Sequence, residues 1–246
     1  MKVYSMFLAM IAAGATPAAY AEGNVPLSAS PNLDDDVKQI VLDELWERSE
    51  LSKRDRSLVT VTAVVAQGHS AVLPFQFALA LDNGVTPQEL AGVLSHLVYY
   101  SGLSASVAAE SALARVFAER GVKLSTLRVA EAKPEPDKAA AQAQREVVQS
   151  MVGDVSPGLA HFSNTALNGD LWLRDDLVPR DRSLVTISAL ITQGNVEQLP
   201  VHVRKGLGNG LKRSEIGEII TQLAFYAGWP RAFSAATTIK AMDLPE

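Results

Sequence analysis

The sequence predicts an all-α protein made of two homologous helical domains, and three observations support this prediction. The heptapeptide RDRSLVT occurs at residues 54–60 and again at residues 180–186, and this offset of 126 residues holds without a gap over roughly 60 residues. Apolar side chains recur at the spacing of a helix rather than alternating as in a half-buried strand. The offset also has the size of a small domain, whereas solenoid units are usually about 20 to 50 residues long.

The first long helix of each copy is expected to begin at the repeated heptapeptide. Asp55 and Asp181 precede its apolar residues, and an aspartate carboxylate can accept the free backbone N–H groups at a helix start. We therefore predict these two aspartates as N-caps. Gly68 and Gly194 follow the apolar residues and suit the left-handed conformation that often ends a helix.

Three more helices are predicted in the first copy. One covers residues 70–82 and ends at an Asn-Gly pair. The next opens at Thr86, with proline at the first helical position and Glu89 placed for a capping box, and it runs to Tyr100. The last covers residues 104–119.

The N-terminal residues have the three parts of a secretory signal peptide. Lys2 supplies positive charge, residues 6–15 are mostly apolar, and residues 19–21 (AYA) have the small-x-small form of a cleavage site. The apolar run is much shorter than the roughly 20 residues that span a bilayer, and no later stretch is long enough. We therefore expect a periplasmic or secreted protein without a membrane span, whose mature chain starts near Glu22.

These features divide the chain into four segments. They are a signal peptide at 1–21, a first domain at 22–120, a linker at 121–138 and a second domain at 139–246. The linker contains the sequence KPEPD at residues 133–137, where proline blocks helix continuation. Helix is predicted to resume over residues 139–152.

The composition excludes several classes of function. The chain has no cysteine, which excludes disulfides, thiol nucleophiles and cysteine zinc sites. Its net charge of −5 gives no basic surface for nucleic acid. The four histidines lack the spacing of metal ligands, so we expect no metal.

Five segments of the second copy, in order, closely resemble the carboxymuconolactone decarboxylase family. They are RDRSLVTI at 180–187, QLPVH at 198–202, NG at 209–210, EIGEII at 215–220 and AFYAGWP at 224–230. The first copy resembles this family less completely. The resemblance implies the all-α alkylhydroperoxidase D-like fold for both domains. It also implies a homo-oligomer, in which a trimer of two-domain chains would form a six-domain ring.

The family that the sequence resembles contains two chemistries. Its thiol members carry two cysteines three residues apart, followed by a histidine four residues after the second. Placing His202 on that histidine puts Asn195 and Gln198 at the thiol positions, so thiol peroxidase activity is excluded. The decarboxylase branch acts without a cofactor on a lactone that bears a carboxylate. That reaction needs a cation for the carboxylate, an apolar pocket and a proton donor.

Six residues are candidates for this chemistry. His202 would be the acid/base, because it falls on the histidine of the family and histidine titrates near neutral pH. Arg182 or Arg204 would hold the carboxylate, and His96 is a further candidate for binding substrate. Glu218 and Tyr226 would support His202, since their spacing of eight places them on one stripe of a helix.

The histidines are divided between the copies. The counterpart of His202 is Gln76, and the counterpart of His96 is Gln222. Either each copy lends part of a composite site, or the first copy serves only as a scaffold, which is the interpretation that the sequence favours. Lys205, whose counterpart Leu79 is apolar, is specific to the second copy and could hold an anion.

The sequence thus predicts cofactor-free decarboxylation, or proton transfer, on a small carboxylated lactone or related acid. Because the pathway for which the family is named is cytoplasmic, export indicates a different substrate. The alternative is an exported, non-enzymatic ligand-binding or assembly protein that kept the fold. A pocket filled by side chains such as Trp229 or Phe233 would favour this alternative.

Overall fold

The computed structural model describes residues 30–134 and 137–244, and it confirms the all-α prediction. These residues form α-helices and short 3-10 and π turns, and their only β-type pairing is an isolated bridge between Ala132 and Arg174. No helix within the described ranges is long and apolar enough to cross a membrane. The predicted signal peptide, residues 1–21, lies outside them.

The helices of the two copies start at equivalent positions. The first copy contains α4 (Lys53–Ala66), α5 (Leu73–Asp82), α6 (Pro87–Tyr100) and α7 (Leu103–Glu119). The second contains α10 (Pro179–Gln193), α11 (Leu199–Gly208), α12 (Arg213–Tyr226) and α13 (Trp229–Lys240). Each helix of the second copy begins 126 residues after its counterpart, so the repeat in the sequence is also a repeat in the fold.

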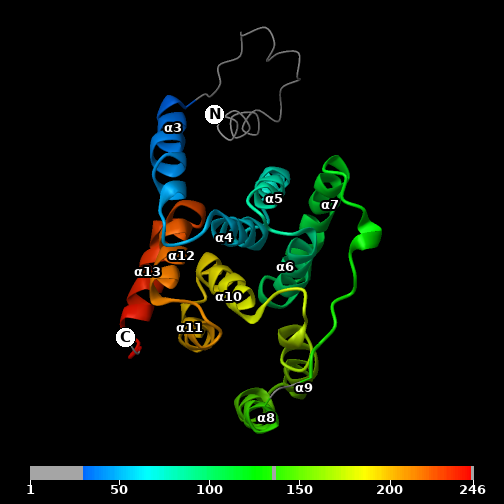
Figure 1. Cartoon of the computed structure of the whole chain (residues 1–246). Helices are drawn as coiled ribbons and strands as arrows, with labels where there is room; N and C mark the ends of the chain where they lie inside the picture. Colours follow the sequence, from blue (N-terminus) through cyan, green and yellow to red (C-terminus); the bar gives the residue numbers. More distant parts are fainter. Residues whose placement is uncertain (1–29, 135–136, 245–246) are drawn as a thin grey trace.

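Shorter helices precede each copy and connect the two. The first copy is preceded by α3 (Pro31–Asp35), a π turn (Asp36–Leu42) and a 3-10 turn (Leu45–Glu47). The connection contains a 3-10 turn (Leu124–Thr126) and α8 (Lys138–Val152), and then α9 (Pro157–Phe162), a π turn (Ser163–Leu167) and a 3-10 turn (Leu171–Leu173) lead into the second copy. Helix α8 has no buried residue and lies at the edge of the molecule (Figure 1).

Helices of each copy pack on helices of the other copy. Helices α4 and α10 lie side by side at the centre, with α12 and α13 on one side and α6 and α7 on the other (Figure 1). Helix α6 of the first copy packs on α10 of the second, and α12 packs on α4. A single hydrophobic core therefore runs through both copies, and each fully buried leucine or valine in it contributes about 1.5–3 kcal/mol.

The helix boundaries correct two expectations. Asp55 and Asp181 are not N-caps, because α4 and α10 begin two residues earlier, and Ser52 accepts the backbone N–H of Asp55 at 3.1 Å. Both aspartates instead lie in the first turn and bind arginines of both copies. The helix predicted from residue 70 begins at Leu73, after a 3-10 turn at Ser70–Val72.

Other helix signals are confirmed. Thr86 and Glu89 form the predicted capping box. Gly68 and Gly194 take positive φ angles of 70° and 81° where α4 and α10 end, which glycine adopts without the steric penalty of a Cβ atom.

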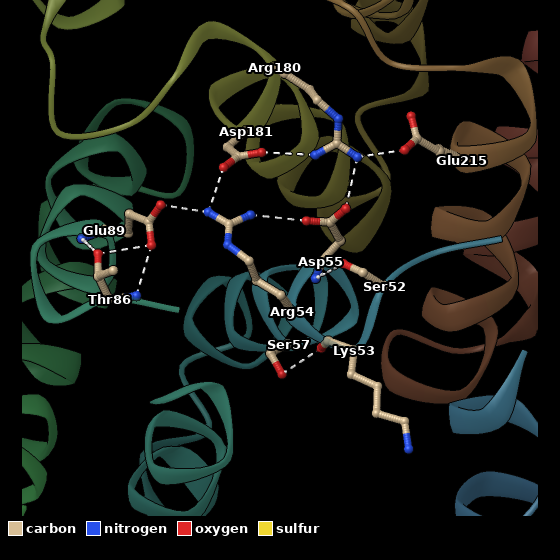
Figure 2. Close-up of polar contacts among 10 residues, drawn as sticks. All are labelled: Ser52, Lys53, Arg54, Asp55, Ser57, Thr86, Glu89, Arg180, Asp181 and Glu215. Carbon is tan, nitrogen blue, oxygen red and sulfur yellow. Dashed lines mark hydrogen bonds and ion pairs between the residues drawn. The ribbon is translucent and has the colours of Figure 1, made fainter. Parts of the chain in front are cut away.

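A network of arginines and carboxylates joins the first turns of α4 and α10 (Figure 2). Arg54 donates to Asp181 at 2.7 Å and to Glu89 at 2.6 Å. Arg180 donates in the equivalent way to Asp55 at 2.8 Å and to Glu215 at 2.6 Å. The repeated RDR motif therefore joins the two copies of the domain.

Candidate functional site

Two equivalent polar clusters lie where α6 meets α10 and where α12 meets α4. The histidine cluster consists of His96, Tyr100, Trp172, Arg182, Thr186 and His202. The glutamine cluster consists of the counterparts of the first five, namely Gln222, Tyr226, Trp46, Arg56 and Thr60. Both copies contribute to each cluster, so a site in either place is composite.

His96 is the innermost member of the histidine cluster. Its side chain is fully buried, and its Nε2 lies 2.7 Å from the Thr186 hydroxyl, which donates to the backbone oxygen of Arg182. The Thr186 oxygen therefore accepts from His96 Nε2–H, and His96 Nδ1 faces the Arg182 guanidinium at 3.4 Å as an acceptor. This pattern fits a neutral imidazole with its proton on Nε2.

The glutamine cluster repeats these two contacts without a histidine. Gln222 Nε2 donates to the Thr60 hydroxyl at 3.0 Å, and Gln222 Oε1 accepts from Arg56 at 2.9 Å. The amide of glutamine thus takes the place of the imidazole, donor for donor and acceptor for acceptor. The fold needs a donor and an acceptor at this position, but it does not need a titratable ring.

Both histidines of the cluster are held neutral. Burial, followed by the charge of Arg182, lowers the pKa of His96 well below its ordinary value. Burial, followed by the charge of Lys205, lowers the pKa of His202 to about 4. At neutral pH both imidazoles are therefore uncharged.

His202 lies between the buried part of the cluster and the surface. Its ring stacks over Trp172 with centroids 6.2 Å apart and meets the edge of Tyr100 at 5.5 Å. Its Nδ1 atom is buried, and no side chain or backbone group of the described residues makes a hydrogen bond to it. A buried ring nitrogen without a partner costs free energy, which a ligand could recover by hydrogen bonding.

Lys205 lies one turn after His202 on α11 and places a cation at the cluster. Its Nζ lies 3.4 Å from the centroid of the Trp172 ring, within the range of a cation–π contact. Residues three apart on a helix share a face, so Lys205 and His202 are neighbours. Arg204, two residues after His202, is exposed and projects from another side of the helix.

Arg182 is fully buried and already bound to other groups. It pairs with Asp176 and donates to the backbone oxygen of Arg174 at 2.9 Å. In the glutamine cluster the equivalent Arg56 pairs with Glu218 of α12 at 2.8 Å. The counterpart of Glu218 is Gly92, and a Cβ atom at Gly92 would lie 3.1 Å from Asp176 Cγ. In the histidine cluster the carboxylate that pairs with the arginine therefore comes from the loop before α10, and not from the neighbouring helix α6.

The six predicted site residues fall in three places. The structure brings His96, Arg182 and His202 together in the histidine cluster. Glu218 and Tyr226 lie in the glutamine cluster instead, and Arg204 lies on the surface.

The expected support of His202 by Glu218 is therefore not formed. The Glu218 carboxylate binds Arg48 at 2.7 Å and Arg56 at 2.8 Å. Although burial opposes it, the hydrogen bonds and charges of these arginines lower the pKa of Glu218. Tyr226 accepts from Trp46 at 2.9 Å, and burial raises its pKa to about 12. Both side chains are occupied by the packing of α12 on the first copy.

The sequence reasoning missed Trp172, Thr186 and Asp176. Trp172 and Thr186 recur at the 126-residue offset as Trp46 and Thr60, and this recurrence was a signal that could have found them. Asp176 gave a weaker signal: its counterpart Glu50 is also acidic, but Glu50 pairs with Arg48 at 3.8 Å, whereas Asp176 pairs with Arg182. No group of three or more His, Asp or Glu side chains in the described ranges is arranged to hold a metal ion.

Comparison with known proteins identifies related sequences. The model described as the carboxymuconolactone decarboxylase family matches residues 31–115 and 157–241, well over half of the chain. A 4-carboxymuconolactone decarboxylase of Acinetobacter baylyi is 34% identical over 84 residues, which are 34% of this chain and 63% of that protein.

Two further relatives match shorter or less similar stretches. The nitrosuccinic acid decarboxylase npaB of Metarhizium robertsii is 34% identical over 67 residues, which are 27% of this chain and 47% of that protein. An uncharacterized 15.0 kDa protein of Paracoccus denitrificans is 30% identical over 99 residues, covering 33% of this chain and 74% of that protein. The chain thus spans less than two thirds of the length of both decarboxylases.

Proposed function

Because the chain belongs to the carboxymuconolactone decarboxylase family, we propose that it catalyses cofactor-free decarboxylation of a small carboxylated lactone or related acid at the histidine cluster. Similarity to two decarboxylases supports a decarboxylase-like function. The observation that carries the proposal is that His96, His202 and Lys205 lie together in one cluster. Their counterparts in the other copy are Gln222, Gln76 and Leu79.

Substrate binding would use the exposed side of the cluster. The Lys205 ammonium acts electrostatically on His202, and the rings of Trp172 and Tyr100 pack against His202. Taking a carboxylate out of water raises its free energy more than that of carbon dioxide, which is neutral. Partial desolvation beside Lys205 therefore favours loss of carbon dioxide.

Proton supply would fall to His202. When carbon dioxide leaves, the electron pair of the broken C–C bond stays on carbon and delocalises toward the lactone carbonyl. A proton must then be added, so the net change consumes one carboxylate and one proton and gives a C–H bond and carbon dioxide. The pKa of His202 is about 4 in the free protein, and a bound anion raises it. His202 can then take a proton from solvent and deliver it to the carbanion.

His96 and Arg182 would position the site rather than bind the substrate. Both are fully buried, and Arg182 is already paired with Asp176. His96 stacks on Tyr100 at 4.8 Å, and Tyr100 in turn lies against His202. His96 thereby helps to fix the Tyr100 ring, against which His202 packs.

The quaternary structure that we propose is a homo-oligomer. Both copies expose an apolar stripe at equivalent positions, Tyr99, Leu103 and Val107 in the first and Phe225, Trp229 and Phe233 in the second. These side chains are 38–64% exposed, so Trp229 and Phe233 do not fill a pocket of their own chain. Two matched stripes suit contacts between chains in a ring. The signal-peptide pattern supports a site of action outside the cytoplasm.

The test measures carbon dioxide release from 4-carboxymuconolactone, nitrosuccinate and a panel of carboxylated lactones. His202→Gln and His96→Gln are suitable variants, because each copies the residue that the other domain carries. His161→Gln, at an exposed histidine of α9, is the matched control.

Each outcome of this test has a clear meaning. Release that falls at least 100-fold in His202→Gln and persists in His161→Gln supports the proposal. Release that survives both cluster substitutions places the reaction elsewhere. If no compound is decarboxylated by folded protein, the non-enzymatic ligand-binding protein becomes the better description.

A further inference from the structure

A polar cavity of about 480 Å³ lies at the C-terminal ends of α4 and α10, and its lining shares no residue with the histidine cluster. Three equivalent pairs from the two copies contribute to its lining: Ala66 with Thr192, Gln67 with Gln193, and His69 with Asn195. Arg231 of α13 completes the lining. The cavity therefore straddles the junction of the duplicated domains, and its volume is within the usual range for small-molecule sites.

The two glutamines give this cavity fixed walls. Gln67 Nε2 donates to the backbone oxygen of Tyr226 at 2.9 Å, and Gln193 Nε2 donates to the backbone oxygen of Tyr100 at 2.7 Å. Each amide also bonds to its own helix, to Ala63 and Ala189 respectively. Each glutamine side chain is thus held by hydrogen bonds both to its own helix and to the other copy.

The charge of the cavity comes from Arg231. None of the residues that line the cavity is acidic, and within residues 30–134 and 137–244 the Arg231 guanidinium makes no ion pair or hydrogen bond. Its counterpart in the first copy is Ala105. The Thr192 hydroxyl in the cavity wall is buried without a partner, and its counterpart is Ala66. Both polar side chains thus stand where the other copy has alanine.

We propose that this cavity is a second ligand site, which binds a small oxyanion through Arg231. The planar guanidinium matches two oxygens of a carboxylate or a phosphate group, and a polar cavity without acids does not repel such an anion. Asn195 and His69 lie on the same lining and supply further polar groups from opposite copies. The site is asymmetric although the fold around it is repeated, because only the second copy carries the arginine.

The experiment titrates the intact protein with inorganic phosphate and, separately, with succinate, at constant ionic strength set with sodium chloride. Isothermal titration calorimetry measures the dissociation constants, and the two probes show which oxyanion the site prefers. Arg231→Ala copies Ala105 and should weaken binding of the preferred probe at least tenfold, while Arg231→Lys should weaken it less. The control is Arg115→Ala, at an exposed arginine of α7, and it should stay within twofold of the wild type.

Two results would overturn this site. One is unchanged binding in Arg231→Ala, and the other is no binding of either probe by the wild type. Lys205→Gln distinguishes the cavity from the histidine cluster, because it should leave binding in the cavity within twofold. A tenfold loss in Lys205→Gln without a loss in Arg231→Ala would assign the oxyanion to the histidine cluster and contradict the proposal. Circular dichroism of each variant verifies that it is folded.

Discussion

Arg180 of the second copy donates a hydrogen bond to Asp55 of the first at 2.8 Å, and the duplication repeats this contact in reverse between Arg54 and Asp181 at 2.7 Å. Each arginine also bonds to the aspartate that follows it, which closes a ring of four charged residues between the copies (Figure 2). The aspartates are buried and the arginines are partly exposed. The most evident repeat in the sequence is thus explained by the packing of one copy on the other.

Asp55→Asn tests this ring. We expect the free energy of unfolding to fall by about 2 kcal/mol, because the neutral amide no longer balances the charge of Arg180. The loss should be smaller than the 3–5 kcal/mol typical of an isolated buried pair (an approximate range), since Arg180 keeps Asp181 and Glu215. Urea denaturation at neutral pH measures the change.

The control for Asp55→Asn is Asp82→Asn. Asp82 pairs with Arg120 on the surface at 2.6 Å, with both side chains more than one third exposed. Removing that pair should cost less than about 1 kcal/mol. Equal effects of the two substitutions would mean that the ring does not fasten the copies together.

A second prediction concerns the position of the carboxylate that pairs with the buried arginine, which differs between the two clusters. Gly92→Ala would place a Cβ atom 3.1 Å from both Asp176 Cγ and Leu177 Cγ, which is tighter than ordinary van der Waals contact. We expect a loss of about 1–2 kcal/mol in the free energy of unfolding, because the loop that carries Asp176 must move away from Arg182.

Gly217→Ala is the matched control for Gly92→Ala. Gly217 lies on α12, where an added Cβ atom would have no packing neighbour within 4 Å, and its counterpart in the first copy is Ala91. The substitution should leave the protein as stable as the wild type or more stable by up to about 1 kcal/mol, as alanine favours helix over glycine. If both alanines have the same effect on urea denaturation, close packing at Gly92 is not what places Asp176.

The helices were predictable from the sequence because their signals are local. The capping box at Thr86 and the stop at Gly68 each depend on a few neighbouring residues, and the structure confirms both. The N-cap assignment of Asp55 failed because α4 already begins at Lys53, where Ser52 is the N-cap and accepts the backbone N–H of Asp55. Asp55 instead accepts a hydrogen bond from Arg180, which is 125 residues away in the chain.

The site was predictable only in part because it depends on which copy packs on which. Helical spacing correctly places Glu218 and Tyr226 on one face of α12, but that face packs on α4 and not on α11. No periodicity reveals that α6 crosses to α10 and brings His96 to Arg182. The comparison of the copies carried the relevant information, since histidine stands against glutamine at both positions.

The pH dependence of stability gives a third prediction. The pKa of His202 is about 4 in the folded protein and about 6.5 in an unfolded chain, so the unfolded state binds this proton at higher pH. The stability that goes with the neutral ring is therefore complete above about pH 6.5 and is lost as the pH falls toward about 4. The loss is on the order of 3 kcal/mol, and His96, whose pKa is also lowered, changes stability in the same direction.

His202→Gln isolates the contribution of this ring. The variant copies Gln76 and should show a smaller loss of unfolding free energy between pH 6.5 and pH 4.5 than the wild type does. His161→Gln, at an exposed ring, should keep the pH dependence of the wild type. Urea denaturation at several pH values measures the slopes, and equal slopes for His202→Gln and the wild type would show that His202 is not held neutral.

The last prediction separates two adjacent cations of α11. Lys205 lies over Trp172 beside His202, whereas Arg204 is exposed on another side of the helix. If Lys205 holds the substrate carboxylate, Lys205→Gln should raise KM at least tenfold for whichever acid is decarboxylated, since an ion pair to a partly desolvated carboxylate is lost. Arg204→Gln should give a smaller increase, although sequence alone had suggested Arg204 for this role.

A second measurement on Lys205→Gln does not depend on activity. The charge of Lys205 is, after burial, the cause that lowers the pKa of His202, so its removal should raise that pKa above about 4. An NMR titration of the histidine rings, assigned with His202→Gln, measures the shift. A larger effect of Arg204→Gln on both KM and the His202 titration would transfer the carboxylate to Arg204. It would also mean that α11 presents a different face to the histidine cluster.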